Sequence, residues 1–342
     1  MAHGPVLINA RAASRPELGG VERWAREMVA RLPQLDPDRY EIARPPARFV
    51  HRAGHAWEQG VLPAHAARRH ARLLLNPANL APLAFPRNVV VIHDAAALRQ
   101  PDWYSGLYAA WQRAILPALA KRALHVVTVS QFSRTELLDL LALDPANVTV
   151  VHGGVDERFH PGVAPARRDR PYVLTVASRT ARKNLGALRR TAQRLRDEHD
   201  GTELLVAGGD RPQFRDDDPT AGLTFLGRVD DADLPGLYAG ARAFVLPSHY
   251  EGFGLTALEA MACGTPVVVS DRTALPEVVG DAGLLVDPDD PEAIAAAVVA
   301  ALDDAELARR GTERAKAFSW SAASSQIDAV LSHLARQTDP RA

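Results

Sequence analysis

The sequence predicts an α/β fold made of two Rossmann-like domains with parallel sheets. Its 342 residues suffice for two domains of ordinary size, each able to bury a hydrophobic core. Short apolar runs alternate with segments of helical periodicity along the chain, which is typical of parallel strands joined by helices. We expect about six strands in each half, without a detectable sequence repeat.

The first half contains the strand and helix signals of one such domain. Strands are predicted at residues 6–10, 88–92, 125–129 and 148–151, and helices at about 21–32, 64–72 and 104–122. Another helix should start at Ser133, because Ser133 and Glu136 have the spacing of a capping box. Gly153 and Gly154, followed by the Pro- and Arg-rich residues 157–171, predict a hinge and a linker. We place the first domain at 1–164.

The second half repeats the alternation of strands and helices. Strands are predicted at 172–177, 204–207, 223–226, 243–246, 267–269 and 284–286. One helix should start near Gly254 and end before Gly264 and Pro266, and another should begin around Leu185. The chain then reads as helical from Pro291 to near Arg336, with a break at 318–321. We place the second domain at 165–320.

Composition favours a cytoplasmic protein. The single cysteine, Cys263, allows no internal disulfide, and the N-terminus lacks the basic segment and long apolar core of a signal peptide. Residues 1–164 carry 19 basic and 14 acidic side chains, against 21 and 27 in the rest. This mild basic excess makes an anionic acceptor, or peripheral contact with the inner membrane surface, a candidate partner. It is too weak to indicate nucleic acid.

The most informative stretch is 248–270, where a predicted strand runs into a loop and then a helix. Glycines remove the Cβ atoms that would keep a ligand from the backbone, and a helix start favours an anion or a polar sugar. Glu251 in the loop and Glu259 on the helix can each accept two hydrogen bonds from a pair of neighbouring hydroxyls. A nucleotide sugar has such pairs on its ribose and on its hexose. The candidate donor-binding residues here are Gly252, Phe253, Gly254, Leu255 and Glu259.

Two cations follow the first strand of the second half. Arg179 and Lys183 lie four residues apart at the expected mouth of a sheet, where such a pair can clamp a diphosphate. The alternative is an exposed basic turn, because basic side chains are common on loops.

Candidate ligand residues in the first half are less specific. His93 ends a predicted strand, at the edge where ligands bind open parallel sheets, although a packed structural histidine is the alternative. Gly19 and Gly20 form a strand-to-helix turn that can approach phosphate, but no full G-x-G-x-x-G follows, which argues against an NAD-dependent oxidoreductase. We expect no metal site and no cofactor. The acids at 216–218 read as solvated charge in a polar loop.

The E-x7-E pair followed by Ala262-Cys-Gly-Thr-Pro-Val-Val resembles the pattern of glycosyltransferase family four, also called group 1. The resemblance covers some twenty consecutive residues and implies the GT-B fold, in which two Rossmann-like domains face a central cleft. It implies a retaining, nucleotide-sugar-dependent enzyme and a C-terminal helix, residues 321–342, that crosses back to the first domain. It also implies that His93 contacts the donor sugar, that Arg179 and Lys183 bind the diphosphate, and that the Gly19–Gly20 turn borders the donor phosphates and the acceptor.

We therefore expect a hexosyltransferase that uses a nucleotide diphosphate sugar and a glycan or lipid-linked acceptor, without a metal. Residues around Trp57, Asn76-Pro77 and 101–104 are similar to transferases that add mannose or a related hexose in polysaccharide biosynthesis. Two alternatives are a sugar-nucleotide epimerase of the same architecture and a catalytically silent nucleotide-sugar-binding partner. The candidate catalytic residues are His93, Arg179, Lys183 and Glu251.

Overall fold

The computed structural model describes residues 4–16, 19–51, 53–209 and 222–338. The chain divides into two compact units. The first contains the chain up to Ala95, Ala110–Gly154 and the chain from Trp320 onward. The second contains Ala96–Ala109 and Val155–Ser319. The change of unit after Gly154 falls at the glycine pair that predicted a hinge.

The first unit contains a six-stranded parallel sheet in the order β2-β1-β3-β4-β5-β6. Its strands are β1 (Val6–Asn9), β2 (Tyr40–Ala43), β3 (Leu73–Asn76), β4 (Asn88–Val91), β5 (His125–Thr128) and β6 (Val148–Val150). The four strands predicted by residue are confirmed within one or two positions. β2 and β3 were expected only as part of the strand total, because β2 is half polar and β3 directly follows residues assigned to a helix.

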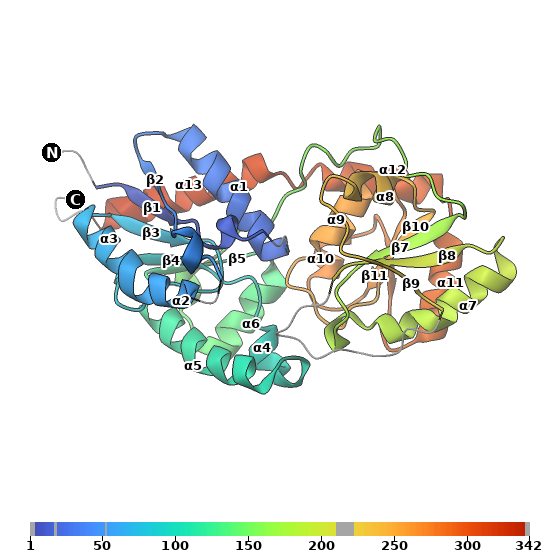
Figure 1. The fold of residues 1–342 in the computed structure, drawn as a ribbon, viewed down its shortest axis with the longest axis horizontal. Helices are drawn as coiled ribbons and strands as arrows, with labels where there is room; N and C mark the ends of the chain where they lie inside the picture. Colours follow the sequence, from blue (N-terminus) through green and yellow to red (C-terminus); the bar gives the residue numbers. More distant parts are fainter. Residues whose placement is uncertain (1–3, 17–18, 52, 210–221, 339–342) are drawn as a thin grey trace. The chain divides into compact units, whose positions relative to one another are not determined.

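Helices cover this sheet. They are α1 (Gly20–Leu35), α2 (Gly54–Ala56), α3 (Leu62–Arg68), α5 (Gly106–Arg122, whose first turn belongs to the second unit), α6 (Gln131–Leu141) and α13 (Trp320–Gln337). α1 and α13 lie side by side, although they are far apart in the sequence (Figure 1). Asp328 of α13 accepts hydrogen bonds from the Tyr40 hydroxyl at 2.5 Å and from Arg39 Nη1 at 3.2 Å, which fixes the last helix to the start of β2.

Two helix starts differ from the prediction. The capping box at Ser133 and Glu136 was wrong, because α6 begins at Gln131 and Ser130 is its N-cap, whose hydroxyl accepts from the Ser133 N–H at 3.0 Å. The basic helix expected at 64–72 instead starts at Leu62 and follows a π-helical turn, Trp57–Val61.

The second unit contains another six-stranded parallel sheet, in the order β12-β11-β10-β7-β8-β9. Its strands are β7 (Tyr172–Val176), β8 (Glu203–Ala207), β9 (Thr224–Gly227), β10 (Ala243–Leu246), β11 (Val267–Ser270) and β12 (Leu284–Val286). All six predicted strands are confirmed within about one residue. Together the two sheets confirm the predicted fold class of two Rossmann-like domains.

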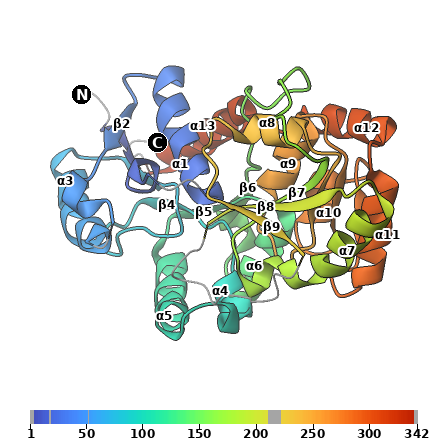
Figure 2. The same ribbon diagram turned by 45° about the vertical axis from the view of Figure 1, so that its right-hand side comes forward.

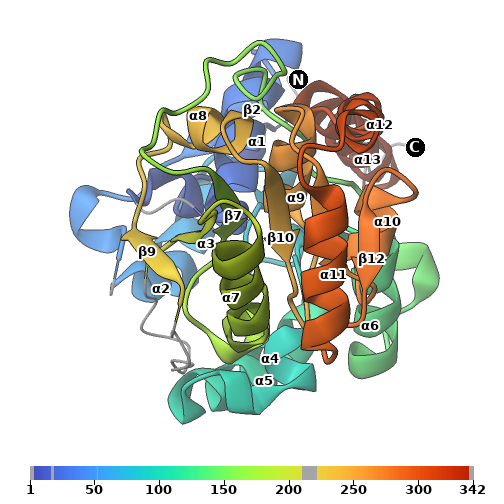
Figure 3. The same cartoon turned by 90° about the vertical axis from the view of Figure 1, so that its right-hand side faces the viewer.

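Helices lie on both faces of the second sheet. They are α7 (Leu188–Glu198), α8 (Leu234–Ala239), α9 (Leu255–Ala262), α10 (Leu275–Val279), α11 (Pro291–Ala301) and α12 (Ala305–Ala315). The short helix α4 (Ala96–Arg99) also belongs to this unit. Figure 3 shows α7 and α11 side by side in front of the strands, and Figure 2 shows α9 on the opposite side of the sheet. The helical region predicted from Pro291 onward has a second break at 302–304, where the Asp304 carboxylate caps α12.

The apolar faces of these elements form the cores. In the second unit Val173, Val245 and Val268 of the strands pack with Leu188 of α7 and Ile294 of α11, and all are essentially inaccessible to solvent. Cys263 is also buried and forms no disulfide, and burial raises the pKa of its thiol to about 12, with a further contribution from the Glu259 charge. These properties fit its prediction as a packing residue. No helix in the described ranges is both long enough and apolar enough to cross a membrane.

Candidate functional site

The candidate site of the second unit is formed by the segments that follow β7 and β10, which are neighbouring parallel strands. The carboxyl ends of both strands therefore lie at one edge of the sheet, where ligands bind in open α/β folds. Lys183 Nζ lies 2.6 Å from Glu251 Oε1, and each side chain is only about one tenth exposed. Two predicted catalytic residues, 68 positions apart, thus form a buried ion pair.

Arg182 is a second cation at Glu251. Its Nη1 lies 3.5 Å from Glu251 Oε2 and donates to the Tyr250 carbonyl at 3.0 Å. Arg182 was not predicted as a site residue, although it directly precedes Lys183 in the sequence. Burial alone would raise the pKa of Glu251, but the charges of Lys183 and Arg182 hold it below its ordinary value. Glu251 is therefore a carboxylate at neutral pH, able to accept hydrogen bonds but not to act as an acid.

The turn after β7 holds Lys183 in place. Ala181–Lys183 form a 3₁₀ turn, and Asn184 follows in the left-handed region with a φ of 53°. Asn184 Nδ2 donates to the Pro247 carbonyl at 3.1 Å and to the Pro288 carbonyl at 2.7 Å. This side chain links the turns that follow β7, β10 and β12, so the position of Lys183 depends on three segments of the sheet edge.

The predicted glycine-rich loop has the expected form. Gly254 is the N-cap of α9 with a φ of 112°, a conformation that favours glycine. A Cβ atom there would lie 2.7 Å from Leu275 Cδ2, so the end of that side chain would have to shift. Gly252 and Leu255 flank this turn. Phe253 is buried and packs edge-to-face on Phe318, with ring centroids 5.8 Å apart. Its side chain therefore stabilises the loop, and a ligand contact there would be made by the backbone.

Glu259 and Arg179, the other two predicted residues, contact side chains other than Lys183 and Glu251. Glu259 lies on α9, is buried, and accepts a hydrogen bond from the Tyr238 hydroxyl at 3.0 Å. The Arg179 guanidinium carbon lies 5.7 Å from the centre of the Phe225 ring of β9. The four residues belong to one unit and follow two neighbouring strands, but only Lys183 and Glu251 are in direct contact among their described interactions.

His93 of the first unit lies two residues after the end of β4, with Ile92 between them. The ring is buried and meets Trp24 edge-on at 5.7 Å, and its Nε2 lies 3.0 Å from the Pro77 carbonyl oxygen. Burial lowers the pKa of His93 despite the opposing contribution of the Pro77 hydrogen bond, so the ring is neutral at pH 7. Because a carbonyl oxygen only accepts, Nε2 carries the proton and Nδ1 is left as a hydrogen-bond acceptor.

The Gly19–Gly20 turn is also fixed by its surroundings. Gly19 caps α1 and Gly20 is the first helical residue. The Glu22 carboxylate accepts from the Gly19 N–H at 3.1 Å and pairs with Arg15 at 3.3 Å. Glu22 was not selected from the sequence, although its position three residues after a helix cap is a known capping signal.

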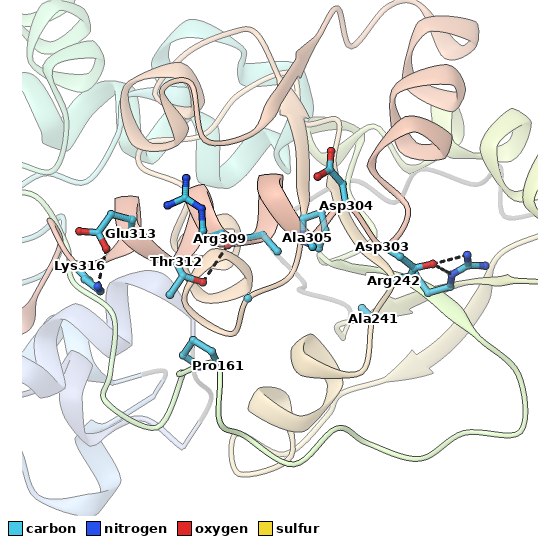
Figure 4. Close-up of a pocket in the computed structure, with 13 residues that line it drawn as sticks. Pro161, Ala241, Arg242, Asp303, Asp304, Ala305, Arg309, Thr312, Glu313 and Lys316 are labelled. Carbon is cyan, nitrogen blue, oxygen red and sulfur yellow. Dashed lines mark hydrogen bonds and ion pairs between the residues drawn. The ribbon is translucent and has the colours of Figure 1, made fainter.

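A separate hollow of about 600 Å³ lies in the second unit at the amino ends of β10 and β11 (Figure 4). Arg242 and Pro266, which directly precede these strands, are part of its wall. Its cations face acids: Arg242 Nε donates to Asp303 at 2.8 Å and Lys316 Nζ to Glu313 at 2.6 Å. The hollow is therefore at the sheet edge opposite the candidate site, and its charges are already paired.

The predictions about metals concern two parts of the chain. Within the stretches that the structure describes, no three or more His, Cys, Asp or Glu side chains gather in a group that would hold a metal ion. The acids at 216–218 lie outside the described residues.

Both halves of the chain match families of glycosyltransferases. Residues 170–304 match glycosyl transferases group 1, and residues 18–159 match glycosyltransferase family 4. The chain is 36% identical over 262 residues to O-antigen chain mannosyltransferase B of Escherichia coli, which covers 70% of this chain and 68% of that protein. It is 33% identical to a glycogen synthase of Mycobacterium tuberculosis (74% and 65% covered) and 33% identical to the MMP alpha-(1->4)-mannosyltransferase of Mycolicibacterium hassiacum (73% and 66%). The matches thus span about two thirds of these relatives.

Solved structures of transferases share the fold over nearly the whole chain. Sucrose-phosphate synthase from Thermosynechococcus elongatus superposes with a TM-score of 0.75 at 20% identity, covering 97% of this chain and 99% of that one. WaaG, a glycosyltransferase involved in lipopolysaccharide biosynthesis, gives a TM-score of 0.70 at 16% identity, covering 94% and 98%. At these identities the likeness establishes the fold alone.

Proposed function

The chain belongs to glycosyltransferase family 4, the glycosyl transferases of group 1, and on this premise we propose that it transfers a hexose from a nucleotide diphosphate sugar to a hydroxyl group. The acceptor is a glycan or a lipid-linked glycan, and the configuration at the anomeric carbon is retained. The observation that carries the proposal is the buried contact of Lys183 with Glu251, beside Arg182, at the carboxyl edge of the second sheet.

The cations are proposed to bind the donor diphosphate. Arg179 and Lys183 both follow β7, at the edge where a phosphate group can approach the backbone. As the bond from the sugar to the diphosphate breaks, negative charge grows on the leaving phosphate, and fixed cations stabilise it. When the donor binds, Lys183 must exchange part of its contact with Glu251 for phosphate oxygens. Arg182 would then keep Glu251 paired with a positive charge.

The carboxylates are proposed to bind hydroxyl groups. Glu251, kept ionised by its two cations, would accept hydrogen bonds from neighbouring hydroxyls of the hexose. Glu259 would accept from the ribose, with the Tyr238 hydroxyl holding its second oxygen. Gly252, Gly254 and Leu255 would bring backbone N–H groups to the donor at the start of α9.

The first unit is proposed to contribute His93 and the Gly19–Gly20 turn. The neutral ring of His93 presents Nδ1 as an acceptor, which suits a sugar hydroxyl that needs to be oriented. A neutral histidine held by burial and a carbonyl is a positioning group more than a general base. The glycine turn, fixed by Glu22, would border the donor phosphates and the acceptor.

The proposed reaction needs no covalent intermediate on the protein. The bond between the anomeric carbon and the phosphate oxygen breaks, and its electron pair stays on the nucleoside diphosphate. The acceptor oxygen attacks from the same side and forms the new glycosidic bond. Its proton passes to the departing phosphate oxygen, which the cations hold close by.

Mannose is the proposed sugar, in the assembly of an envelope polysaccharide. Two relatives are named as mannosyltransferases, of an O-antigen chain and of MMP, while a third is named as a glycogen synthase. A cytoplasmic setting, with contact of the basic first half with the inner membrane surface, fits such an acceptor.

The test is a donor screen followed by product analysis. UDP-, GDP- and dTDP-hexoses are first tested for thermal stabilisation, because a ligand that binds only the folded chain raises its melting temperature. The stabilising donor is then incubated with and without a mannan-type oligosaccharide acceptor. Transfer to the acceptor supports the proposal. Epimerised donor without transfer would indicate an epimerase, and binding without any turnover would indicate a silent binding partner.

A further inference from the structure

The segment Ala96–Ala109 packs as part of the second unit, although the residues on both sides of it belong to the first. It contains α4, a 3₁₀ turn at Pro101–Trp103 and the first turn of α5. Tyr104 is buried and stacks on Tyr108, with ring centroids 5.4 Å apart. The segment therefore has a defined conformation, in which Trp103 faces the rest of the second unit.

Trp103 contacts the loop that carries Glu251. Its indole lies nearly parallel to the His249 ring, with centroids 6.5 Å apart and an angle of 17°. It also meets the Tyr250 ring at 6.3 Å and 69°. Both separations are within the range of favourable aromatic contacts. Trp103 thus packs on the two residues that immediately precede Glu251.

Other contacts tie the same two residues to the cation turn. The His249 N–H donates to the Arg182 carbonyl at 3.0 Å, and Arg182 Nη1 donates to the Tyr250 carbonyl at 3.0 Å. These bonds fix the backbone of the loop, whereas Trp103 fixes its side chains. Removing the indole would take away this packing on the rings of His249 and Tyr250, so the loop should open more often and its backbone amides should exchange faster.

We propose that Trp103 is a positioning residue that holds the loop His249–Glu251 so that the Glu251 carboxylate has a single orientation toward the donor hexose. This inference rests on the proposed function, because it assigns Trp103 an effect on sugar placement. No sequence pattern indicated this role, since the contact joins residues 146 positions apart.

The role predicts a specific kinetic pattern. Arg179 and Lys183, which are proposed to bind the diphosphate, make no described contact with Trp103, so binding of a nucleoside diphosphate without sugar should be unchanged. Misplacement of a sugar-binding group by about 1 Å can lower the rate by about 100-fold. Trp103→Ala should therefore lower kcat by about 10- to 100-fold while the KM for the donor changes less than about threefold.

The experiment compares the full-length wild type with Trp103→Ala, Trp103→Phe and Leu107→Ala. Phenylalanine keeps a ring against His249 and should restore most of kcat. Leu107 lies in the same segment and is 86% exposed, so its truncation should change nothing. Measurements are kcat and donor KM, the Kd of UDP and GDP, and hydrogen exchange of peptides covering 248–252.

The outcomes separate this inference from the proposed function. A fall in kcat with unchanged nucleotide affinity, reversed by phenylalanine, supports the role of Trp103. If the wild type transfers hexose and Trp103→Ala does so equally well, the inference is wrong while the proposed function stands. If the wild type transfers nothing, the proposed function fails, and unchanged hydrogen exchange at 248–252 in Trp103→Ala would also overturn the loop-holding role.

Discussion

Lys183 Nζ lies 2.6 Å from Glu251 Oε1, and both side chains are about nine tenths buried. Desolvating such a pair costs free energy, which the attraction between the two charges offsets, and Arg182 adds a second positive charge at Glu251. We propose that both residues bind the donor, Lys183 through a phosphate and Glu251 through a sugar hydroxyl. On this proposal the pair connects the stability of the second unit with donor binding.

Breaking this pair should destabilise the chain strongly. Glu251→Leu should lower the free energy of unfolding by about 3–5 kcal/mol, because it removes the carboxylate that neutralises the buried Lys183. Lys183→Met should cost less, because Arg182 still pairs with Glu251. The double variant should be less destabilised than the sum of the two, since it removes both members of the pair. Urea denaturation of the four proteins measures this coupling.

A matched control is available on the surface. Lys316 Nζ and Glu313 Oε2 are also 2.6 Å apart, but both side chains are about two thirds exposed. A double-mutant cycle of this pair should give a much smaller coupling energy than the buried pair, because solvent screens exposed charges. Equal coupling energies for the two pairs would show that burial does not strengthen the contact of Lys183 with Glu251.

Gly254→Ala should destabilise the start of α9. The φ of 112° is strained for any side chain, by about 1–3 kcal/mol, and the new Cβ would meet Leu275 Cδ2. Gly60→Ala is the control, because no atom lies within 4 Å of a Cβ built there. Thermal melting compares the two, and a Gly254→Ala protein as stable as the wild type would refute the requirement for glycine.

Stability should decrease as the pH falls from about 6.5 toward 4. Burial, with a smaller contribution from the His333 charge, lowers the pKa of His125 to about 4, against an ordinary value of 6.5. The unfolded chain therefore binds a proton in this window that the folded chain does not, and the loss reaches on the order of 3 kcal/mol. The lowered pKa of His93 acts in the same direction.

The variant His125→Gln tests whether His125 causes this pH dependence of stability. It removes the titrating ring, so the slope of unfolding free energy against pH should become smaller between pH 6.5 and 4. Above pH 7.5 the rings of His125 and His93 are neutral in the folded and unfolded chains. The difference in unfolding free energy between wild type and His125→Gln at that pH therefore gives the cost of the substitution itself. An unchanged slope would place the pH dependence elsewhere.

Asp328→Ala should loosen the last helix from the first unit. The substitution leaves the buried Tyr40 hydroxyl without its acceptor, which should cost about 1–3 kcal/mol. Tyr40→Phe in the same background removes that hydroxyl and should recover part of the loss. Hydrogen exchange of α13 peptides should rise in Asp328→Ala, and a failure of Tyr40→Phe to recover stability would contradict this explanation.

The sequence predicted the second unit more fully than the first. Strands such as Val267–Ser270 and Ala243–Leu246 are continuous apolar runs bounded by Gly, Pro or charged residues, so their ends were readable. Tyr40–Ala43 alternates poorly and could not be placed. At α6 the spacing of Ser133 and Glu136 indicated a cap, but the helix begins earlier, and the Ser130 hydroxyl caps it by accepting from the Ser133 N–H.

Within the site, local patterns were readable and long-range contacts were not. The spacing of Glu251, Gly254 and Glu259 indicated a loop followed by a helix, which the structure has. The bonds of Arg182 to Tyr250 and of Asn184 to Pro288 join segments that are distant in sequence, so no local pattern reveals them. The same is true of Trp103, whose assignment to the second unit depends on ring packing.

The most direct test of the central claim is a calorimetric titration of the stabilising nucleoside diphosphate into the wild type and Arg179→Met. Arg179 makes a ring contact with Phe225 that methionine can largely preserve, so the fold should persist. If the segments after β7 bind the diphosphate, Arg179→Met should weaken binding by at least about tenfold, equivalent to about 1.4 kcal/mol. An unchanged Kd in a folded Arg179→Met protein would contradict the assignment of the donor site.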